Sequence, residues 1–176
     1  MRSKLLAVSA LSATVLLLSL TSAAKQKPVK LAMKDAQGKT VGWAMVQPSG
    51  SGVEVRLTLD GMPPGEHAVH YHQNPSCEGP DFKSAGPHFN PDNKQHGSLN
   101  PQGHHAGDMP NFTVNANGKA DAKIKDPDVN LNPAGDPHSL LNNGGSAIVV
   151  HAKADDFKTD PSGNSGDRIA CGVISR

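Results

Sequence analysis

Seven histidines and one aspartate have the types and spacing of ligands for metal ions. They are His70, His72, His88, His96, His104, His105, His151 and Asp108. Imidazole nitrogens suit copper and zinc, and a carboxylate can complete a tetrahedral zinc site. No single spacing is specific, but together they predict two metal ions that share a ligand.

The His-x-His pair, His70 and His72, is suited to chelating one ion if it lies on a β-strand. Residues i and i+2 of a strand face the same side, so the two imidazoles would project together. His151 ends the apolar run 147–150 and could bring a third imidazole to the same place. Two other interpretations stay open: a polar face of an exposed strand for the pair, and a satisfied core or edge residue for His151.

Four more candidates lie in the polar, glycine- and proline-rich stretch 77–109: His88, His96, His105 and Asp108. Three imidazoles and one carboxylate fill a tetrahedral zinc site and leave no open position, which is typical of a structural site. Histidines in a loop are ordinarily just solvated. Loops of this length without secondary structure are uncommon unless they are functional, and a bound metal can supply the missing order.

The rest of the chain reads as β-structure that would carry these residues. Apolar residues alternate with polar ones in four stretches: Leu31 and Met33; Val41, Trp43 and Met45; Val53, Val55, Leu57 and Leu59; and Ala120, Ala122 and Ile124. Turn signals rich in Gly, Pro, Asn and Asp separate the stretches. No segment after the N-terminus has helical periodicity. The pattern predicts one all-β domain, an antiparallel sandwich or flattened barrel.

The N-terminus has the order of a secretory signal peptide. Arg2 and Lys4 precede the mostly apolar run 5–20, and small residues follow up to Ala23 and Ala24. We expect cleavage near Ala23 or Ala24, a signal peptide over 1–23 and a mature domain over 24–176. An uncleaved anchor is the alternative, although the run is shorter than the roughly 20 residues of a spanning helix. The expected location is the periplasm, the cell envelope or the medium.

The mature chain would be nearly neutral, with 15 basic and 16 acidic side chains once two of the 17 basic residues are removed. This balance does not call for nucleic acid or an anionic membrane as a partner. The two cysteines, Cys77 and Cys171, would form one disulfide in an exported chain; two buried thiols or a copper–thiolate site are the alternatives.

Longer motifs carry a specific resemblance. The segments 65–72 (GEHAVHYH), 84–91 (SAGPHFNP), 105–108 (HAGD), 146–156 (SAIVVHAKADD) and 167–174 (DRIACGVI) occur in this order. From about Val29 to the C-terminus the chain resembles the copper/zinc superoxide dismutase family. The resemblance implies an eight-stranded antiparallel Greek-key β-barrel with long metal-binding loops and the metal site outside the barrel wall.

The resemblance also implies roles for individual residues. The implied copper ligands are His70, His72, His88 and His151, and the implied zinc ligands are His88, His96, His105 and Asp108. Arg168 would attract superoxide, and His88, which would bridge the two ions, would supply a proton. Asp155 and His67 would support the ligands, Cys77 and Cys171 would be the disulfide pair, and His104 and His138 match no ligand.

The implied activity is the conversion of superoxide to dioxygen and hydrogen peroxide by copper cycling between two oxidation states, with zinc in a structural role. One alternative is a non-enzymatic copper- or zinc-binding protein of the same fold, although storage needs no anion-attracting arginine. A zinc hydrolase would need an open zinc position and a general base. The sequence leaves a monomer and a homodimer both open.

Overall fold

The computed structural model describes residues 26–133 and 135–176, so the predicted signal peptide and its cleavage point lie outside the described residues. The strands are β1 (Val29–Asp35), β2 (Thr40–Ser49), β3 (Gly52–Asp60), β4 (Gly65–His67), β5 (Val69–His72), β6 (Phe112–Val114), β7 (Lys119–Asp126), β8 (Ser146–His151) and β9 (Arg168–Ile174). Two short 3-10 helices, η1 (Lys83–Ala85) and η2 (Asn142–Gly144), lie in loops. Within the described part, no helix has the length and hydropathy that crossing a membrane requires.

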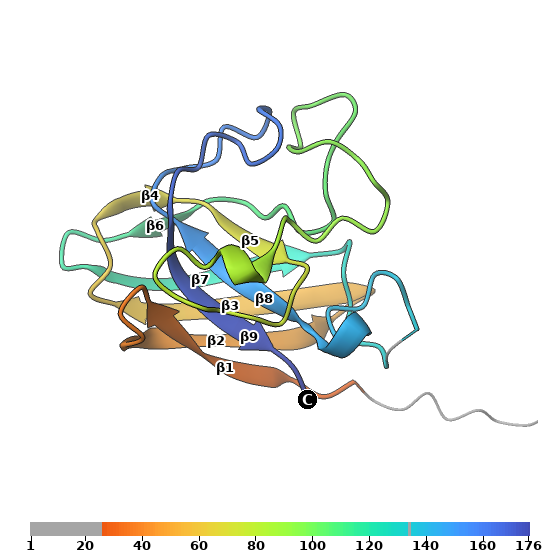
Figure 1. The fold of residues 1–176 in the computed structure, drawn as a ribbon, viewed down its shortest axis with the longest axis horizontal. Coiled ribbons are helices and arrows are strands. Elements are labelled where there is room, and N and C mark those ends of the chain that lie inside the picture. The colour runs from red at the N-terminus through yellow and green to blue at the C-terminus, as the bar shows by residue number, and fades with distance from the viewer. Residues whose placement is uncertain (1–25, 134) are drawn as a thin grey trace, which may run out of the picture.

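Seven strands form one antiparallel sheet in the order β5-β8-β9-β1-β2-β3-β7, and β4 pairs with β6 (Figure 1). Only Ala68 separates β4 from β5, so the two segments form one bent strand and the domain has eight strands in all. Because β4 continues into the edge strand β5, and β6 turns directly into the other edge strand β7, the small pair connects the two edges. The sheet therefore curls into the predicted antiparallel barrel or sandwich.

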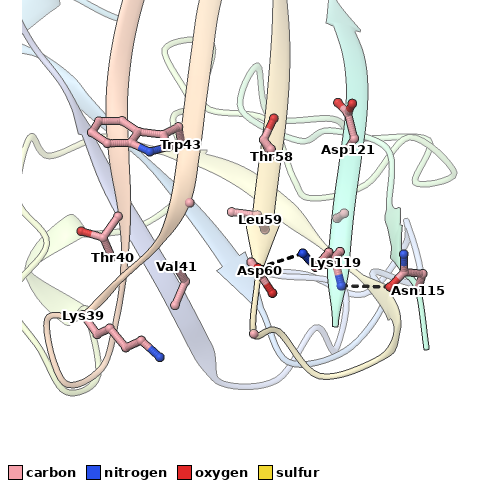
Figure 2. A pocket seen from close by; sticks show the side chains of 13 residues that line it. Lys39, Thr40, Val41, Trp43, Thr58, Leu59, Asp60, Asn115, Lys119 and Asp121 are labelled. Carbon is pink, nitrogen blue, oxygen red and sulfur yellow. Dashed lines mark hydrogen bonds and ion pairs between the residues drawn. The ribbon is translucent and has the colours of Figure 1, made fainter. Parts of the chain in front are cut away.

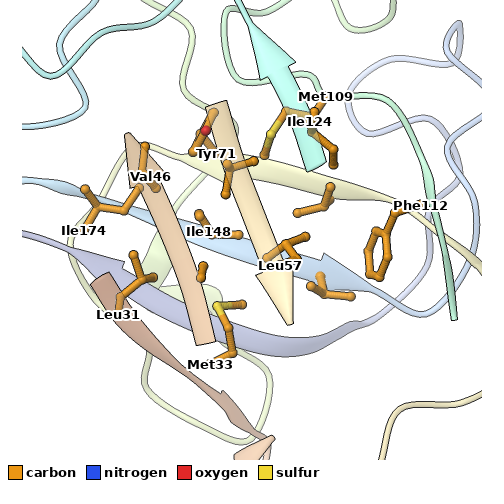
Figure 3. Packing of buried hydrophobic residues seen from close by; sticks show 14 of the residues in the cluster. Leu31, Met33, Val46, Leu57, Tyr71, Met109, Phe112, Ile124, Ile148 and Ile174 are labelled. Atoms are coloured by element: carbon orange, nitrogen blue, oxygen red, sulfur yellow. The ribbon is translucent and has the colours of Figure 1, made fainter. Parts of the chain in front are cut away.

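The core fills the inside of this curl. Leu57 and Val46 from one side meet Tyr71 and Ile148 from the other, and all four are fully buried (Figure 3). In β3 the predicted alternation holds, since Val53, Val55, Leu57 and Leu59 all point inward. Burial of these apolar side chains stabilises the folded state by about 1.5–3 kcal/mol for each large side chain.

The predicted alternation of Val41, Trp43 and Met45 in β2 is wrong. Val41 is buried, but Trp43 points outward and remains 48% exposed, and Ala44 and Val46 face the core instead. The cause is a β-bulge, which shifts the register between β1 and β2 next to Gly42. One extra residue moves the following side chains to the opposite face.

Two long loops rise from the same side of the curled sheet, one between β5 and β6 and the other between β8 and β9 (Figure 1). A backbone hydrogen bond of 2.8 Å from Leu99 to Phe157 joins them. The predicted disulfide is present: Cys77 of the first loop is bonded to Cys171 of β9, with their Cα atoms 5.7 Å apart. The disulfide thus anchors the first loop to the sheet.

Candidate metal centre

The sheet carries three of the candidate ligands. His70 and His72 lie on β5. Val69, which precedes His70, and Tyr71, which lies between the two histidines, face the core. β5 pairs with β8, which ends at His151, so all three imidazoles project from the outer side of the same two strands. His88 approaches from the first loop and forms a β-bridge opposite His72. We call His70, His72, His88 and His151 the strand cluster.

The strand cluster has the form of a metal site. One ligand nitrogen from each of its four residues lies within 4.8 Å of all the others. In the strand cluster, four buried nitrogens have no hydrogen-bond partner among the residues that the structure describes: His70 Nδ1, His72 Nε2, His88 Nε2 and His151 Nε2. Buried polar atoms are nearly always paired, so four unpaired nitrogens in one place indicate an ion that they would share.

The other ring nitrogen of each strand-borne histidine is held by the protein. His70 Nε2 donates to Asp155 Oδ2 at 2.7 Å, and His72 Nδ1 donates to the Gly86 carbonyl at 2.8 Å. His151 Nδ1 lies 3.1 Å from Ser165 Oγ. Such contacts fix the tautomer and orientation of a metal-binding imidazole.

A second cluster lies in the loop between β5 and β6 and comprises His88, His96, His105 and Asp108; we call it the loop cluster. The Oδ1 atom of Asp108 is 2.8, 3.0 and 3.2 Å from the Nδ1 atoms of His88, His96 and His105, and the Nδ1 atoms of His88 and His105 are 3.4 Å apart. Ligands about 2.0–2.1 Å from a tetrahedral zinc lie about 3.3 Å from one another. The donor set and its spacing therefore fit zinc.

His88 belongs to both clusters, because its Nδ1 faces the loop cluster and its Nε2 faces the strand cluster. The two sites share this one imidazole ring. Its centroid lies 4.1 Å from that of His70 on one side and 5.4 Å from that of His105 on the other. The two clusters therefore meet at His88.

Asp155 connects the clusters a second time. Its carboxylate accepts hydrogen bonds from His70 Nε2 at 2.7 Å and from His96 Nε2 at 2.9 Å. Asn111 exchanges two hydrogen bonds with the Asp155 backbone. Gly163 packs so closely that a Cβ atom there would lie 1.8 Å from Asp155 Oδ1. The carboxylate is therefore confined between the two rings.

The electrostatics of the strand cluster favour neutral imidazoles. Burial lowers the pKa of His70 and of His151 to about 4 and that of His88 to about 3. Burial also lowers the pKa of His72 well below its ordinary value. Metal ligation requires the neutral ring, so these nitrogens are available for an ion at neutral pH.

The loop cluster has the opposite electrostatics. Burial alone would raise the pKa of Asp108, but hydrogen bonds from the histidines, His105 and His88 first, hold it well below its usual range. Burial alone would lower the pKa of His96, but hydrogen bonds to Asp108 and Asp155 raise it to about 9. Without a metal the loop cluster is therefore held together by a carboxylate and a protonated imidazole.

Arg168 adjoins the strand cluster. Its guanidinium donates to the carbonyls of Phe82 at 2.7 Å and Gly86 at 2.8 Å, and His72 also donates to that Gly86 carbonyl. Arg168 lines a surface hollow together with Asp81 and Lys83. A fixed cation therefore lies between the strand cluster and an opening to solvent.

Three further histidines lie outside the two clusters. The His67 ring contacts the carbonyl oxygens of His151 and Pro63, each at 2.8 Å. His104 contacts Asp128 at 2.9 Å, and His138 contacts Asp92 at 3.2 Å. Only His67 thus touches the backbone of a candidate ligand.

The sequence interpretation did not include several groups that shape the site: the carbonyls of Phe82 and Gly86, Ser165 Oγ, Asn111 and Gly163. Backbone carbonyls have no sequence signal. The Gly-Pro step at 86–87, directly before His88, is the nearest available hint of a constrained backbone there.

Comparisons with known proteins agree with this geometry. The model of the family "Copper/zinc superoxide dismutase (SODC)" matches residues 40–174. The chain is 46% identical over 141 residues to superoxide dismutase [Cu-Zn] 2 of Aquifex aeolicus, covering 80% of this chain and 82% of the relative. It is also 46% identical over 143 residues to superoxide dismutase [Cu-Zn] of Caulobacter vibrioides, covering 81% and 82%.

Solved structures give the same picture. The P104H mutant of a SOD-like protein from Bacillus subtilis superposes with a TM-score of 0.81 at 42% identity, covering 84% of this chain and 97% of that one. The Cu/Zn superoxide dismutase from Brucella abortus superposes with a TM-score of 0.68 at 30% identity, covering 85% and 100%. The similarity therefore extends over nearly the whole described domain.

Proposed function

The chain belongs to the copper/zinc superoxide dismutase family, its activity is superoxide dismutation, and we propose how its own residues divide that work. Two superoxide anions and two protons give one dioxygen and one hydrogen peroxide. The alternative, a non-enzymatic metal-binding protein of the same fold, is not favoured by the comparisons.

The strand cluster is the proposed copper site, with His70, His72, His88 and His151 as ligands. The observation that carries this assignment is the set of four buried ring nitrogens without a partner. An all-imidazole donor set suits copper, and the lowered pKa values keep these rings neutral.

The loop cluster is the proposed zinc site, with His88, His96, His105 and Asp108 as ligands. Its three nitrogens and one carboxylate oxygen leave no open position, so the ion would have a structural role. Asp155 would orient one ligand of each metal through His70 and His96, and His67 would support His151 through its carbonyl.

Bound copper supplies the one-electron redox chemistry that divides dismutation into two half-reactions, and bound zinc supplies a fixed positive charge. When its Nε2 is not engaged as a ligand, His88 would take a proton from solvent at that atom, which faces the strand cluster, and donate it to the second superoxide as that anion is reduced. Solvent would supply the second proton of hydrogen peroxide. The Nδ1 of His88 stays on the Asp108 side, 2.8 Å from the carboxylate, which keeps the ring in place during the transfer.

Arg168 would bind the anionic substrate beside the strand cluster. Two carbonyl acceptors fix the guanidinium, so little orientation remains to be lost when the anion arrives. A matched test compares Arg168→Gln with Lys158→Gln, which removes an exposed cation from the neighbouring loop. Arg168→Gln should lower the second-order rate constant about tenfold or more, within the range that steering supplies. Equal effects of the two changes would contradict a specific role for Arg168.

We also propose that the enzyme works outside the cytoplasm, with residues 1–23 as a signal peptide. The disulfide between Cys77 and Cys171 supports this, because such bonds persist in oxidising compartments. Expression with and without residues 1–23, followed by cell fractionation, tests it. Equal export of both forms would contradict the signal-peptide assignment.

The first experiment is metal analysis by mass spectrometry on purified protein together with a dismutation assay. One copper and one zinc per chain with rapid dismutation is expected. Zinc alone, with no dismutation after copper is added back, would contradict the copper assignment.

A further inference from the structure

The outer face of strands β1, β2, β3 and β7 carries more basic than acidic side chains. Of the 17 basic residues, Arg2, Lys4 and Lys25 precede the described part, which therefore has 14 basic and 16 acidic side chains. Yet the outward positions of these four strands hold six basic and three acidic residues: Lys30, Lys34, Arg56, Lys119, Lys123 and Lys125, with Glu54, Asp60 and Asp121. We call these nine residues and Trp43 the basic face.

The strand register concentrates positive charge within this face. Lys30 of β1 lies opposite Met45 of β2, which lies opposite Arg56 of β3, which lies opposite Lys123 of β7. Neighbouring strands are about 4.8 Å apart, so the row extends about 14 Å across the sheet. Like charges directly opposite one another destabilise a sheet. Here Arg56 also binds Asp121, two residues before Lys123, which offsets part of this repulsion.

The acidic residues of the face neutralise only part of its positive charge. Asp121 is bound by Arg56 at 2.6 Å, and Asp60 is bound by Lys119 at 3.2 Å, where Figure 2 shows the pair across β3 and β7. No ion pair holds Lys123 among the described residues. These pairs neutralise Arg56 and Lys119, and Glu54 lies opposite Lys125. Lys30, Lys34 and Lys123 carry the excess positive charge that can act on a partner.

Trp43 adds an apolar component in the middle of this face. Thr58 of β3 lies opposite it, and Asp121 of β7 lies opposite Thr58 (Figure 2). The Lys30 ammonium lies 4.6 Å from the centre of the indole ring. Shallow hollows of about 700 and 270 Å³ lie on its two sides. A large exposed indole among lysines is typical of surfaces that meet the water–lipid interface.

These observations decide between partners. A second copy of the chain would bring two positive faces together, which disfavours this face as a self-interface. Nucleic acid fits the charge, but the disulfide points to an oxidising compartment outside the cytoplasm. An exposed indole among cations also suits the interfacial region of an anionic bilayer, where apolar burial adds to electrostatic attraction. We propose that the basic face adsorbs reversibly to a lipid bilayer that contains anionic headgroups.

The position of the face is compatible with catalysis on the membrane. The strand cluster lies on the outer side of β5 and β8, and the core, where Tyr71 and Ile148 meet Leu57 and Val46, separates these strands from β2 and β3 (Figure 3). Adsorption through the basic face therefore leaves the metal centre directed away from the bilayer and open to dissolved superoxide.

The test uses the metal-loaded protein with vesicles of phosphatidylglycerol and phosphatidylcholine or of phosphatidylcholine alone. Trp43 is the sole tryptophan of the chain, so its fluorescence reports directly on this face. We expect co-sedimentation with the anionic vesicles alone, loss of binding at high salt, and a blue shift of the Trp43 emission. Binding equal on both vesicle types, or without an emission change, would overturn the proposal.

A pair of matched variants locates the contact. Lys30→Gln with Lys123→Gln should weaken partition about 25-fold, or about fivefold per lysine. Lys94→Gln with Lys153→Gln changes the net charge equally but lies on the metal-loop side, and it should leave partition unchanged. Equal loss in both pairs would overturn the proposal. So would tighter binding to a soluble polyanion such as dextran sulfate, which would assign the face to polymers. Neither readout depends on dismutase activity, so failure here would leave the proposed function untouched.

Discussion

The two ligand clusters share His88 but are held in position by different forces. The strand cluster is carried by β5 and β8, whose opposite sides are packed in the core, and its metal-facing nitrogens touch no acid. The loop cluster lies in a long loop and converges on the carboxylate of Asp108. The sheet preorganises one site, whereas in the other the ligands themselves hold the loop together.

The largest expected effect is a loss of dismutation when a ligand that belongs to the strand cluster alone is removed. His151→Ala should lower dismutation by at least about 100-fold, more than the loss of an outer hydrogen-bond partner usually costs. Zinc content should remain at one per chain, because His151 touches no member of the loop cluster other than the shared His88. Paired measurements of activity and metal content check this. Loss of both metals would show that the clusters are not independent.

The next largest effect is on the stability of the loop, and it comes from removing the carboxylate at the centre of the loop cluster. Asp108→Ala leaves His88, His96 and His105 without their common partner, and breaking such a buried charged contact costs about 3–5 kcal/mol. We expect faster proteolysis within residues 77–109 and loss of zinc. Asp92→Ala, an exposed carboxylate of the same loop, is the control. Equal protease sensitivity of the two variants would contradict a central role for Asp108.

The clusters should also respond to pH with opposite signs when the protein is metal-free. His70 and His151, with pKa values lowered to about 4, stay neutral in the folded state while the unfolded chain takes up protons near 6.5. Their contribution to the free energy of unfolding is present above pH 6.5 and lost as the pH falls through 4, by about 1.4 kcal/mol per pH unit and histidine. His96, with a pKa raised to about 9, contributes below pH 6.5, and this is lost as the pH rises through 9.

Urea unfolding of the metal-free protein at several pH values measures how the free energy of unfolding changes between pH 4 and 6.5 and between pH 6.5 and 9. His151→Gln should flatten the change between pH 4 and 6.5 and leave the change between pH 6.5 and 9 as it is. His96→Gln should flatten the change between pH 6.5 and 9 and leave the change between pH 4 and 6.5 as it is. If each substitution affected both pH ranges equally, the electrostatic contrast between the clusters would be wrong.

The smallest expected effect is on the rate at which superoxide reaches the metal centre, because only the strand cluster must be accessible to substrate. Asp81 forms a 2.9 Å ion pair with Lys83 in the hollow beside Arg168, so it cancels positive charge where an anion enters. Asp81→Asn should raise the second-order rate constant about two- to threefold at low salt and leave it unchanged at high salt, because screening removes such effects. A salt-independent change would indicate a structural effect instead.

The sequence predicts those parts of the site that depend on local spacing. Strand periodicity places His70 and His72 on one face, and the apolar run before His151 identifies a buried strand. The pairing of β5 with β8, which joins them, was available only through the family resemblance, because pairing depends on contacts distant in sequence.

Other features were not predictable for physical reasons. Trp43 turns outward because of a bulge whose extra residue leaves no clear mark in the pattern of apolar residues. The net charge near zero concealed the basic face, since composition records how many charges a chain has and not which side of a sheet they occupy. The carbonyl of Gly86, which holds both His72 and Arg168, belongs to the backbone and has no residue signature.

Gly163 limits how this enzyme can diversify. In the loop between β8 and β9, any side chain at residue 163 would collide with the Asp155 carboxylate and with His96 Nε2, 2.8 Å from the added atom. A single methyl group there would disturb, through Asp155, one proposed ligand of each metal at once. For directed evolution of substrate access, position 163 is therefore the one to keep fixed while its neighbours are randomised.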